Sequence, residues 1–221
     1  MSKTKQGSQH MVVPLMIGAF LSSLGQSLMT ASVPQISRAY NISEATGEWL
    51  TMGYILILGI VSAFTAFLIN RIPTRRLFLT TMSLFTVGIV VSLLAPNFPV
   101  LLFGRLIQGV GAGVMLPLTQ VVLMNSYPKN RQGSAFAMIG IVLAFAPAIG
   151  PTVAGILNDS FGFESIFILM LVMALAALLI GLKLVHNVGE TTNETLDVIS
   201  AVLYSVGFSV LMIGVSATNV I

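Results

Sequence analysis

Long apolar runs separated by short polar connections dominate this chain. A bilayer-spanning helix needs about 20 predominantly apolar residues. Such a run must be helical, because backbone groups in lipid have to be hydrogen-bonded within their own segment. The alternation of apolar and polar residues typical of a membrane β-barrel is missing. The pattern therefore predicts an all-α integral membrane protein, with helices near 12–33, 48–69, 77–95, 100–123, 134–157, 165–184 and 198–219.

A polar stretch divides the pattern into two unequal parts. Residues 1–185 hold six of the apolar runs and are predicted to form a six-helix bundle. Residues 186–197 are rich in Asn, Thr and Glu and are predicted to be a linker, followed by a seventh membrane helix within 198–221. A seventh helix that stops at Ile221 leads us to expect a piece of a longer chain. Its partner would then be a second bundle, in the same or a separate chain.

Composition supports a membrane protein and explains the charge. The chain is 56% hydrophobic and 8% charged, whereas soluble domains average about 25% charged residues. The net charge is +3, and the cations concentrate on alternate connections. This distribution indicates that the excess of cations sets the orientation of the helices in the membrane and does not serve nucleic-acid binding. By the positive-inside rule, those connections and the N-terminus are predicted to be cytoplasmic. The cations on that side are Lys3, Lys5, Arg71, Arg75, Arg76, Lys129, Arg131 and Lys183.

Arg105 is the one charged side chain in the interior of a long apolar run. A lone cation in hydrocarbon costs at least about 2.5–3.5 kcal/mol unless it faces a partner or a water-filled cavity. Arg105 lies about 9 Å along its helix from Pro99, and Gln108 follows nearly one turn deeper on a similar face. We interpret this pair as a functional site. The alternative is that Arg105 satisfies helix-end carbonyls or extends to the nearby surface.

Glycines and prolines mark two runs for close packing or bending. Gly109 and Gly113 form a G-x-x-x-G step, which lets a neighbouring helix approach closely. The run 134–157 carries two prolines, which bend a membrane helix without unfolding it. We predict a hinge or a tightly packed seal there, and the alternative is a bent helix with a structural role alone. The residues concerned are Gly140, Pro147, Gly150, Pro151 and Gly155.

Uncharged polar side chains inside the runs are candidates to line a cavity. Each either lines a cavity or hydrogen-bonds a neighbouring helix, a contact worth about 0.6 kcal/mol. Gln26 is the strongest cavity candidate because it lies in the middle of its run, and the others are Thr30, Tyr54 and Gln120. The chain has no cysteine and two isolated histidines, so we expect no metal site and no cofactor. We find no nucleophile–base pair or paired carboxylates, and therefore predict no enzymatic activity.

Three motifs resemble those of the major facilitator superfamily. Leu102 to Gly113 reads L-x-x-R-x-x-Q-G-x-G-A-G and resembles its motif B. Gly150 to Gly155 reads G-P-x-x-A-G and resembles motif C, which marks the drug:proton antiporter branches. The connection after the second run resembles a degenerate motif A, in which Leu68, Arg71 and Arg75 match and Asn70 replaces the acid. The chain as a whole is similar to fourteen-helix lincomycin-resistance and multidrug exporters of Gram-positive bacteria.

The resemblance implies a major-facilitator N-terminal bundle plus one further helix, in a bacterial plasma membrane. It implies export of small amphipathic or cationic drugs against protons by alternating access. Arg105, Gln108 and Gly109 would then serve proton coupling. The first-helix acid of that subfamily is Gly25 here, and no Asp or Glu lies in the interior of any run. The location of the coupling acid is therefore open. Two alternatives stay open: a truncated or regulatory module that does not transport, and a facilitator-type importer, against which motif C argues.

Overall fold

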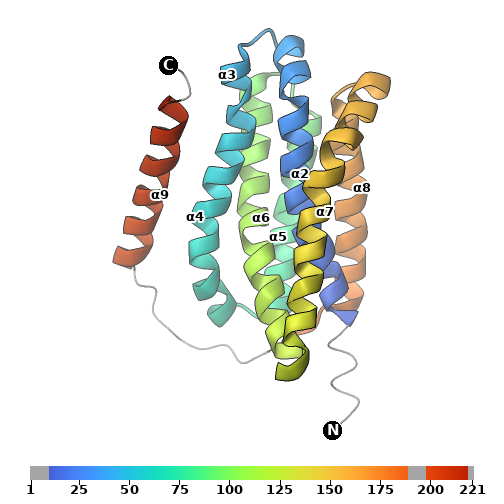
Figure 1. Cartoon of the computed structure of the whole chain (residues 1–221), viewed down its shortest axis with the longest axis vertical. Helices are drawn as coiled ribbons and strands as arrows, with labels where there is room; N and C mark the ends of the chain where they lie inside the picture. Colours follow the sequence, from blue (N-terminus) through green and yellow to red (C-terminus); the bar gives the residue numbers. More distant parts are fainter. Residues whose placement is uncertain (1–9, 189–197, 219–221) are drawn as a thin grey trace.

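The computed structural model describes residues 10–188 and 198–218, and within them the chain is helical, with no strand. Six of the described helical stretches are long and apolar enough to cross a membrane, which confirms the predicted fold class. The long helices run roughly parallel to one another (Figure 1). In chain order the elements are α2 (Val12–Ala39), α3 (Glu44–Gly47), α4 (Trp49–Arg71), α5 (Thr74–Leu93), α6 (Phe98–Ser126), α7 (Lys129–Phe161), α8 (Glu164–Leu184) and α9 (Val198–Thr218).

Two helices are longer than the apolar pattern predicts. The helix predicted over 12–33 continues through Pro34 to Ala39. The helix predicted over 134–157 begins at Lys129 and ends at Phe161, a length of 33 residues. Hydropathy detects only the part of a helix that suits hydrocarbon, whereas backbone hydrogen bonding continues into polar turns at either end. Both prolines of α7 lie inside this continuous helix.

Helix α6 packs between α4 and α5, and its glycines make this possible. A Cβ atom added to Gly109 would lie 2.9 Å from the carbonyl oxygen of Tyr54, and one added to Gly113 would lie 2.8 Å from that of Leu58. The close approach predicted for this G-x-x-x-G step is confirmed, with α4 as the neighbour. On the other side of α6, Gly111 meets the backbone of α5 in the same way.

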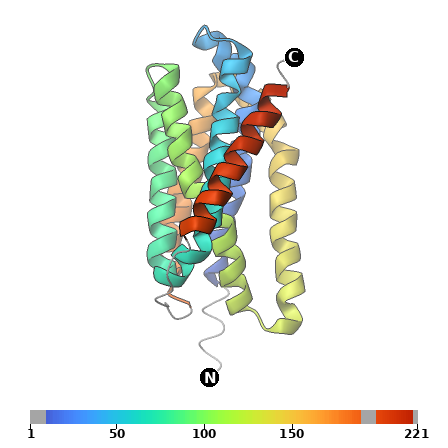
Figure 2. The same ribbon diagram turned by 90° about the vertical axis from the view of Figure 1, so that its left-hand side faces the viewer.

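Helix α7 contacts the rest of the bundle mainly along α2. Its buried positions include Ala146, Gly150, Ala154 and Asn158, a four-residue spacing that forms one stripe on a helix. Most of its remaining surface is exposed, including large apolar side chains such as Phe145. In Figure 2 α7 stands apart from α6 over most of its length. A face of the bundle is therefore left open between α7 and the α4–α6 pair.

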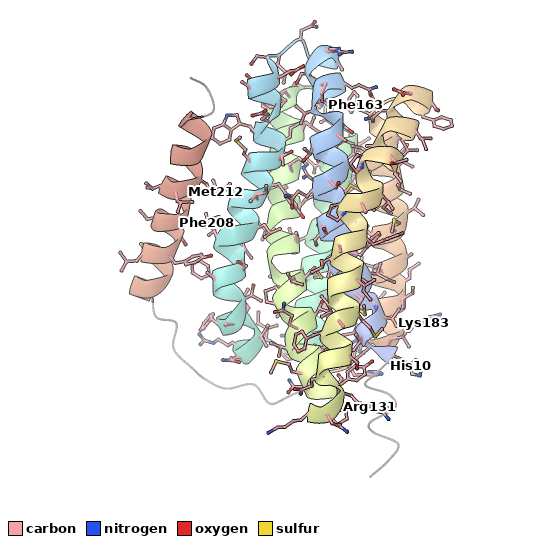
Figure 3. The ribbon with its side chains drawn as sticks, viewed as in Figure 1. His10, Arg131, Phe163, Lys183, Phe208 and Met212 are labelled. Carbon is pink, nitrogen blue, oxygen red and sulfur yellow. The ribbon has the colours of Figure 1, made fainter. Side chains whose placement is uncertain are left out.

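Most of the described cations lie at one end of the bundle, whereas Arg38, in the last turn of α2, lies at the other end with the acids. Arg131 and Lys183 lie at one end together with His10, and Phe163 lies at the other (Figure 3). The α4–α5 connection, with its three arginines, is at the same end as Arg131, which we call the cationic end. The described acids lie in the α2–α4 and α7–α8 connections at the opposite end. The charge asymmetry expected from alternate connections is thus present within the described residues.

Helix α9 lies alongside α4 (Figures 1 and 2). Phe208 packs over Gly59 of α4, where any Cβ would overlap its ring. Tyr204 stacks on Phe208 with ring centroids 6.0 Å apart. A seventh helix after the bundle is therefore present. Residues 189–197 of the predicted linker lie outside the described part of the chain.

Candidate functional site

Arg105 is fully buried, with an exposed fraction of 0%. Its Nε donates a hydrogen bond to the Leu50 carbonyl at 3.3 Å, and its Nη1 donates to Gln108 Oε1 at 2.7 Å. The guanidinium carbon lies 4.3 Å from the centre of the Tyr54 ring, within the range of a cation–π contact. Arg105 and Gln108 therefore point into the bundle, and Arg105 does not extend to the surface. The other alternative, that Arg105 satisfies helix-end carbonyls, agrees with its bond to Leu50 in the first turn of α4.

The Arg105 contacts tie four helices together. Gln108 Nε2 donates to Ser92 Oγ on α5 at 3.0 Å, and Tyr54 Oη donates to the Ser22 carbonyl on α2 at 2.8 Å. Gly88 of α5 lets Gln108 reach this position, since a Cβ there would lie 2.7 Å from the Gln108 backbone nitrogen. We call Arg105, Gln108, Tyr54 and Ser92 the guanidinium cluster. Tyr54 is fully buried in it and hydrogen-bonds α2, which is the second of the two alternatives given for it, contact with a neighbouring helix.

The guanidinium cluster contains no carboxylate. A carbonyl, an amide oxygen and an aromatic face surround the cation, and Arg105 Nη2 has no hydrogen-bond partner among the described residues. An unpaired buried donor costs free energy unless something outside the described residues satisfies it. The cluster is therefore suited to receive one more acceptor, such as a water oxygen or a carboxylate.

Two adjoining pockets lie on the open face of the bundle. The first, of about 460 Å³, is bounded by α2, α4, α6 and Leu143 of α7. The second, of about 420 Å³, is bounded by α2 and by Pro147 and Pro151 of α7. Gln26 lines both pockets and Thr30 lines the second. Gln120 is half-buried and lines neither of these two.

The polar lining of the pockets comes mostly from serines that the sequence analysis missed. Three of them lie on α2 with Gln26 and Thr30 at helical spacing, a periodic signal that could have identified them, and the fourth, Ser62, lies on α4. Ser22 also joins the pockets to the guanidinium cluster, because its carbonyl accepts from Tyr54 while the residue lines the first pocket. The pocket serines are Ser22, Ser23, Ser27 and Ser62.

The motif C residues divide between two faces of α7. Gly150 packs against the Ser27 side chain, with which any added Cβ would overlap. Close packing at Gly140 and Gly155 is wrong for the described bundle, since a Cβ at either would have no atom within 4 Å. At about 100° per residue, Gly155 lies about 140° around the helix from Gly150. It therefore faces away from α2.

The motif A-like residues lie at the cationic end, far along the helices from Arg105. Arg75 Nη2 donates to the Leu182 carbonyl at 3.0 Å, and the Arg75 backbone N–H donates to Asn187 Oδ1 at 3.1 Å. Arg71 lies over the Phe67 ring at 5.5 Å. Leu68 and Asn70 belong to the last turns of α4. Arg75 is thus hydrogen-bonded to the end of α8 and to the start of the linker.

Comparison with known proteins identifies the family to which this helical bundle belongs. The family model described as Major Facilitator Superfamily matches residues 15–217. The MFS-type transporter YcnB of Bacillus subtilis is 41% identical over 93% of this chain and 43% of its own length. The lincomycin resistance protein LmrB of the same organism is 34% identical over 96% of this chain and 45% of its own.

A solved peptide transporter POT, in complex with sulfate, superposes with a TM-score of 0.72 at 15% identity, over 95% of this chain and 45% of that one. The chain spans less than half the length of these relatives. The family match covers nearly all the described helices, and the helical fold agrees with it. The chain is a multi-pass membrane protein that belongs to the major facilitator superfamily, whose members transport small molecules.

Proposed function

We propose that this chain is the first half of a proton-coupled exporter of small amphipathic or cationic compounds in a bacterial plasma membrane. The observation that carries the proposal is the pair of adjoining pockets on the open face of the bundle. Gln26, which lines both, lies midway along α2. A transporter of this architecture binds its solute near the midplane between two bundles. This bundle supplies one wall, and a second bundle would supply the other.

The pocket lining suits an amphipathic solute. The lining residues are hydroxyl, amide and apolar groups, and none of them carries a charge. Such a wall binds by apolar contact with a few hydrogen bonds and accepts solutes of varied shape. The similarity to a lincomycin resistance protein makes lincosamides the first compounds to test.

Arg105 is proposed to link solute binding to proton binding. It lies behind the first pocket, separated from it by Tyr54 and the Ser22 backbone. Its unpartnered Nη2 can donate a hydrogen bond to a carboxylate that has lost its proton and pair with the negative charge, and Gln108 holds the guanidinium in position. Since the described spans hold no interior carboxylate, we place that acid in the second bundle. Gly109 would keep α4 and α6 close enough to preserve this geometry.

The charge asymmetry gives the proposed orientation. The cationic end would lie in the cytoplasm, together with the N-terminus, by the positive-inside rule. Helix α6 starts at the opposite end, so Arg105 would lie in the outer half of the membrane. Reactivity of single cysteines placed next to Arg131 and Phe163 towards an impermeant reagent, in intact cells, would test this. Labelling next to Arg131 would refute it.

The function is tested by efflux of cationic dyes and lincosamides from energised vesicles, comparing this chain with a longer form that includes a second bundle. We expect proton-gradient-dependent efflux by the longer form. Arg105→Ala should abolish it, and Gln26→Leu should lower it for some compounds. Gln120→Leu, a polar-to-apolar change on α6 outside both pockets, is the matched control. Efflux that survives collapse of the proton gradient would favour the facilitator, and its absence in both forms would favour a non-transporting module.

A further inference from the structure

A third pocket, separate from the transport face, lies at the cationic end. It has a volume of about 410 Å³ and lies between the first two turns of α5 and the residues that follow α8. We propose that it binds the phosphate-bearing headgroup of an anionic phospholipid. We call it the arginine pocket; its lining residues are Pro73, Arg75, Arg76, Leu79, Thr80 and Asn187.

The charge of the arginine pocket is uncompensated within the described residues. Arg75 and Arg76 are both exposed, and neither forms an ion pair there. Arg75 uses one guanidinium nitrogen for the Leu182 carbonyl, and a guanidinium has several further N–H donors. The described acids lie at the opposite end of the bundle. Two adjacent guanidinium groups with a nearby Thr80 hydroxyl form a donor set that suits a phosphate.

The pocket is held in shape by hydrogen bonds between α5 and the start of the linker. Thr74 Oγ1 donates to the Val188 carbonyl at 3.0 Å and accepts from the Val188 N–H at 3.4 Å. Asn187 Oδ1 accepts from the Arg75 N–H at 3.1 Å, which fixes Asn187 as one wall. Behind it, Gly181 of α8 packs against the Phe78 ring. These contacts fix the wall opposite the arginines before any ligand arrives.

The surface beyond the pocket favours a lipid over a soluble anion. Arg76 and Thr80 begin an exposed stripe on α5 that continues through Ser83, Val87 and Val90, a spacing that keeps all five on one helix face. Val87 is 51% exposed and Val90 is 36% exposed. An anionic head in the pocket would therefore have an apolar track for its acyl chains. Basic pockets between membrane helices bind anionic lipid headgroups in this way.

The test is binding of phosphatidylglycerol to the purified chain in detergent, followed by native mass spectrometry. Phosphatidylcholine and inorganic phosphate are the comparison ligands. We expect phosphatidylglycerol to bind more tightly than either. Arg76→Gln should weaken it about fivefold, the effect expected for one basic residue near an anionic lipid surface. Arg131→Gln, an exposed cation at the same end on α7, is the matched control and should leave binding unchanged.

Three results would overturn the proposal. Equal affinity for phosphatidylglycerol and phosphatidylcholine would remove the role of headgroup charge. Binding of inorganic phosphate as tight as that of the lipid would assign the pocket to a soluble anion. The linker also carries acids after Val188. The third result concerns a variant without these acids (Glu190→Gln, Glu194→Gln and Asp197→Asn), whose lipid binding is measured in the same way. Binding of phosphatidylglycerol by that variant alone, with none by the parent chain, would show that the linker and not a lipid occupies the pocket.

Discussion

Replacing Arg105 by methionine should separate the role of the guanidinium in transport from its role in the fold. Methionine keeps an unbranched stem of similar shape and removes the charge. The change deletes the bonds to Gln108 and the Leu50 carbonyl and the contact with the Tyr54 ring. It also deletes the cost of holding a cation away from water, since Arg105 is fully buried without a carboxylate partner among the described residues.

The two contributions have opposite signs. The bonds of the guanidinium and its contact with the Tyr54 ring stabilise the fold, whereas desolvation of the ion costs several kcal/mol. Replacing a buried ionic group by an apolar one of similar volume is often neutral for this reason. Gln108 Oε1 loses its partner in the variant, at about 1–3 kcal/mol. We therefore expect the free energy of unfolding of Arg105→Met to fall by no more than about 3 kcal/mol.

The assay is denaturant unfolding of the chain in detergent, paired with vesicle efflux by the longer form. Near-parental stability together with lost efflux would show that the guanidinium is kept for transport. Arg131→Met, a change at an exposed cation, controls for charge removal and should leave both measurements unchanged. A stability loss above about 4 kcal/mol, the scale of a broken buried ion pair, would make Arg105 structural. Normal efflux would contradict the proposed coupling.

Two further predictions concern packing and pH. Gly150→Leu should destabilise the chain by about 1–3 kcal/mol, since its side chain would overlap Ser27, whereas Gly155→Leu should be nearly neutral; equal losses in denaturant unfolding would contradict this assignment. Tyr40 donates from its hydroxyl to the Ala95 carbonyl at 2.9 Å, and burial, with the Glu164 charge second, raises its pKa above 10.0. This contribution to stability is present below pH 10 and lost as pH rises through the raised pKa, so unfolding measured from about pH 9 to about pH 11 should show a steeper loss in the parent than in Tyr40→Phe.

The sequence was sufficient to predict the helices and to place Arg105 and Gln108 on a similar helix face. A three-residue spacing on a helix places two side chains on one face whatever surrounds them. The other members of the guanidinium cluster could not be found that way. Tyr54 and Leu50 meet Arg105 across 51 and 55 residues of chain, and an aromatic residue in an apolar run fits a pocket wall or a helix contact equally well. Only the packing of α4 on α6 decides between them.

The same limit applies at the linker. Asn70 stands where the related family has an acid, and the sequence directs attention to the α4–α5 connection alone. The structure shows that Asn187, 112 residues after Arg75, also accepts from the first turn of α5. Composition identified 186–197 as polar, yet it gave no reason to expect its first residues to lie against the arginines.

Helix α7 shows what motif spacing can and cannot specify. Ala146, Gly150, Ala154 and Asn158 follow a four-residue spacing, and small side chains at that spacing let α7 approach α2 closely. Gly155 is outside this stripe, so its small size has no use within the described bundle. A second bundle that covers the open face would require a small residue at Gly155. In that case Gly155→Leu would leave the stability of this chain unchanged and would impair efflux by the longer form. Gly150→Leu, in contrast, would act mainly on folding.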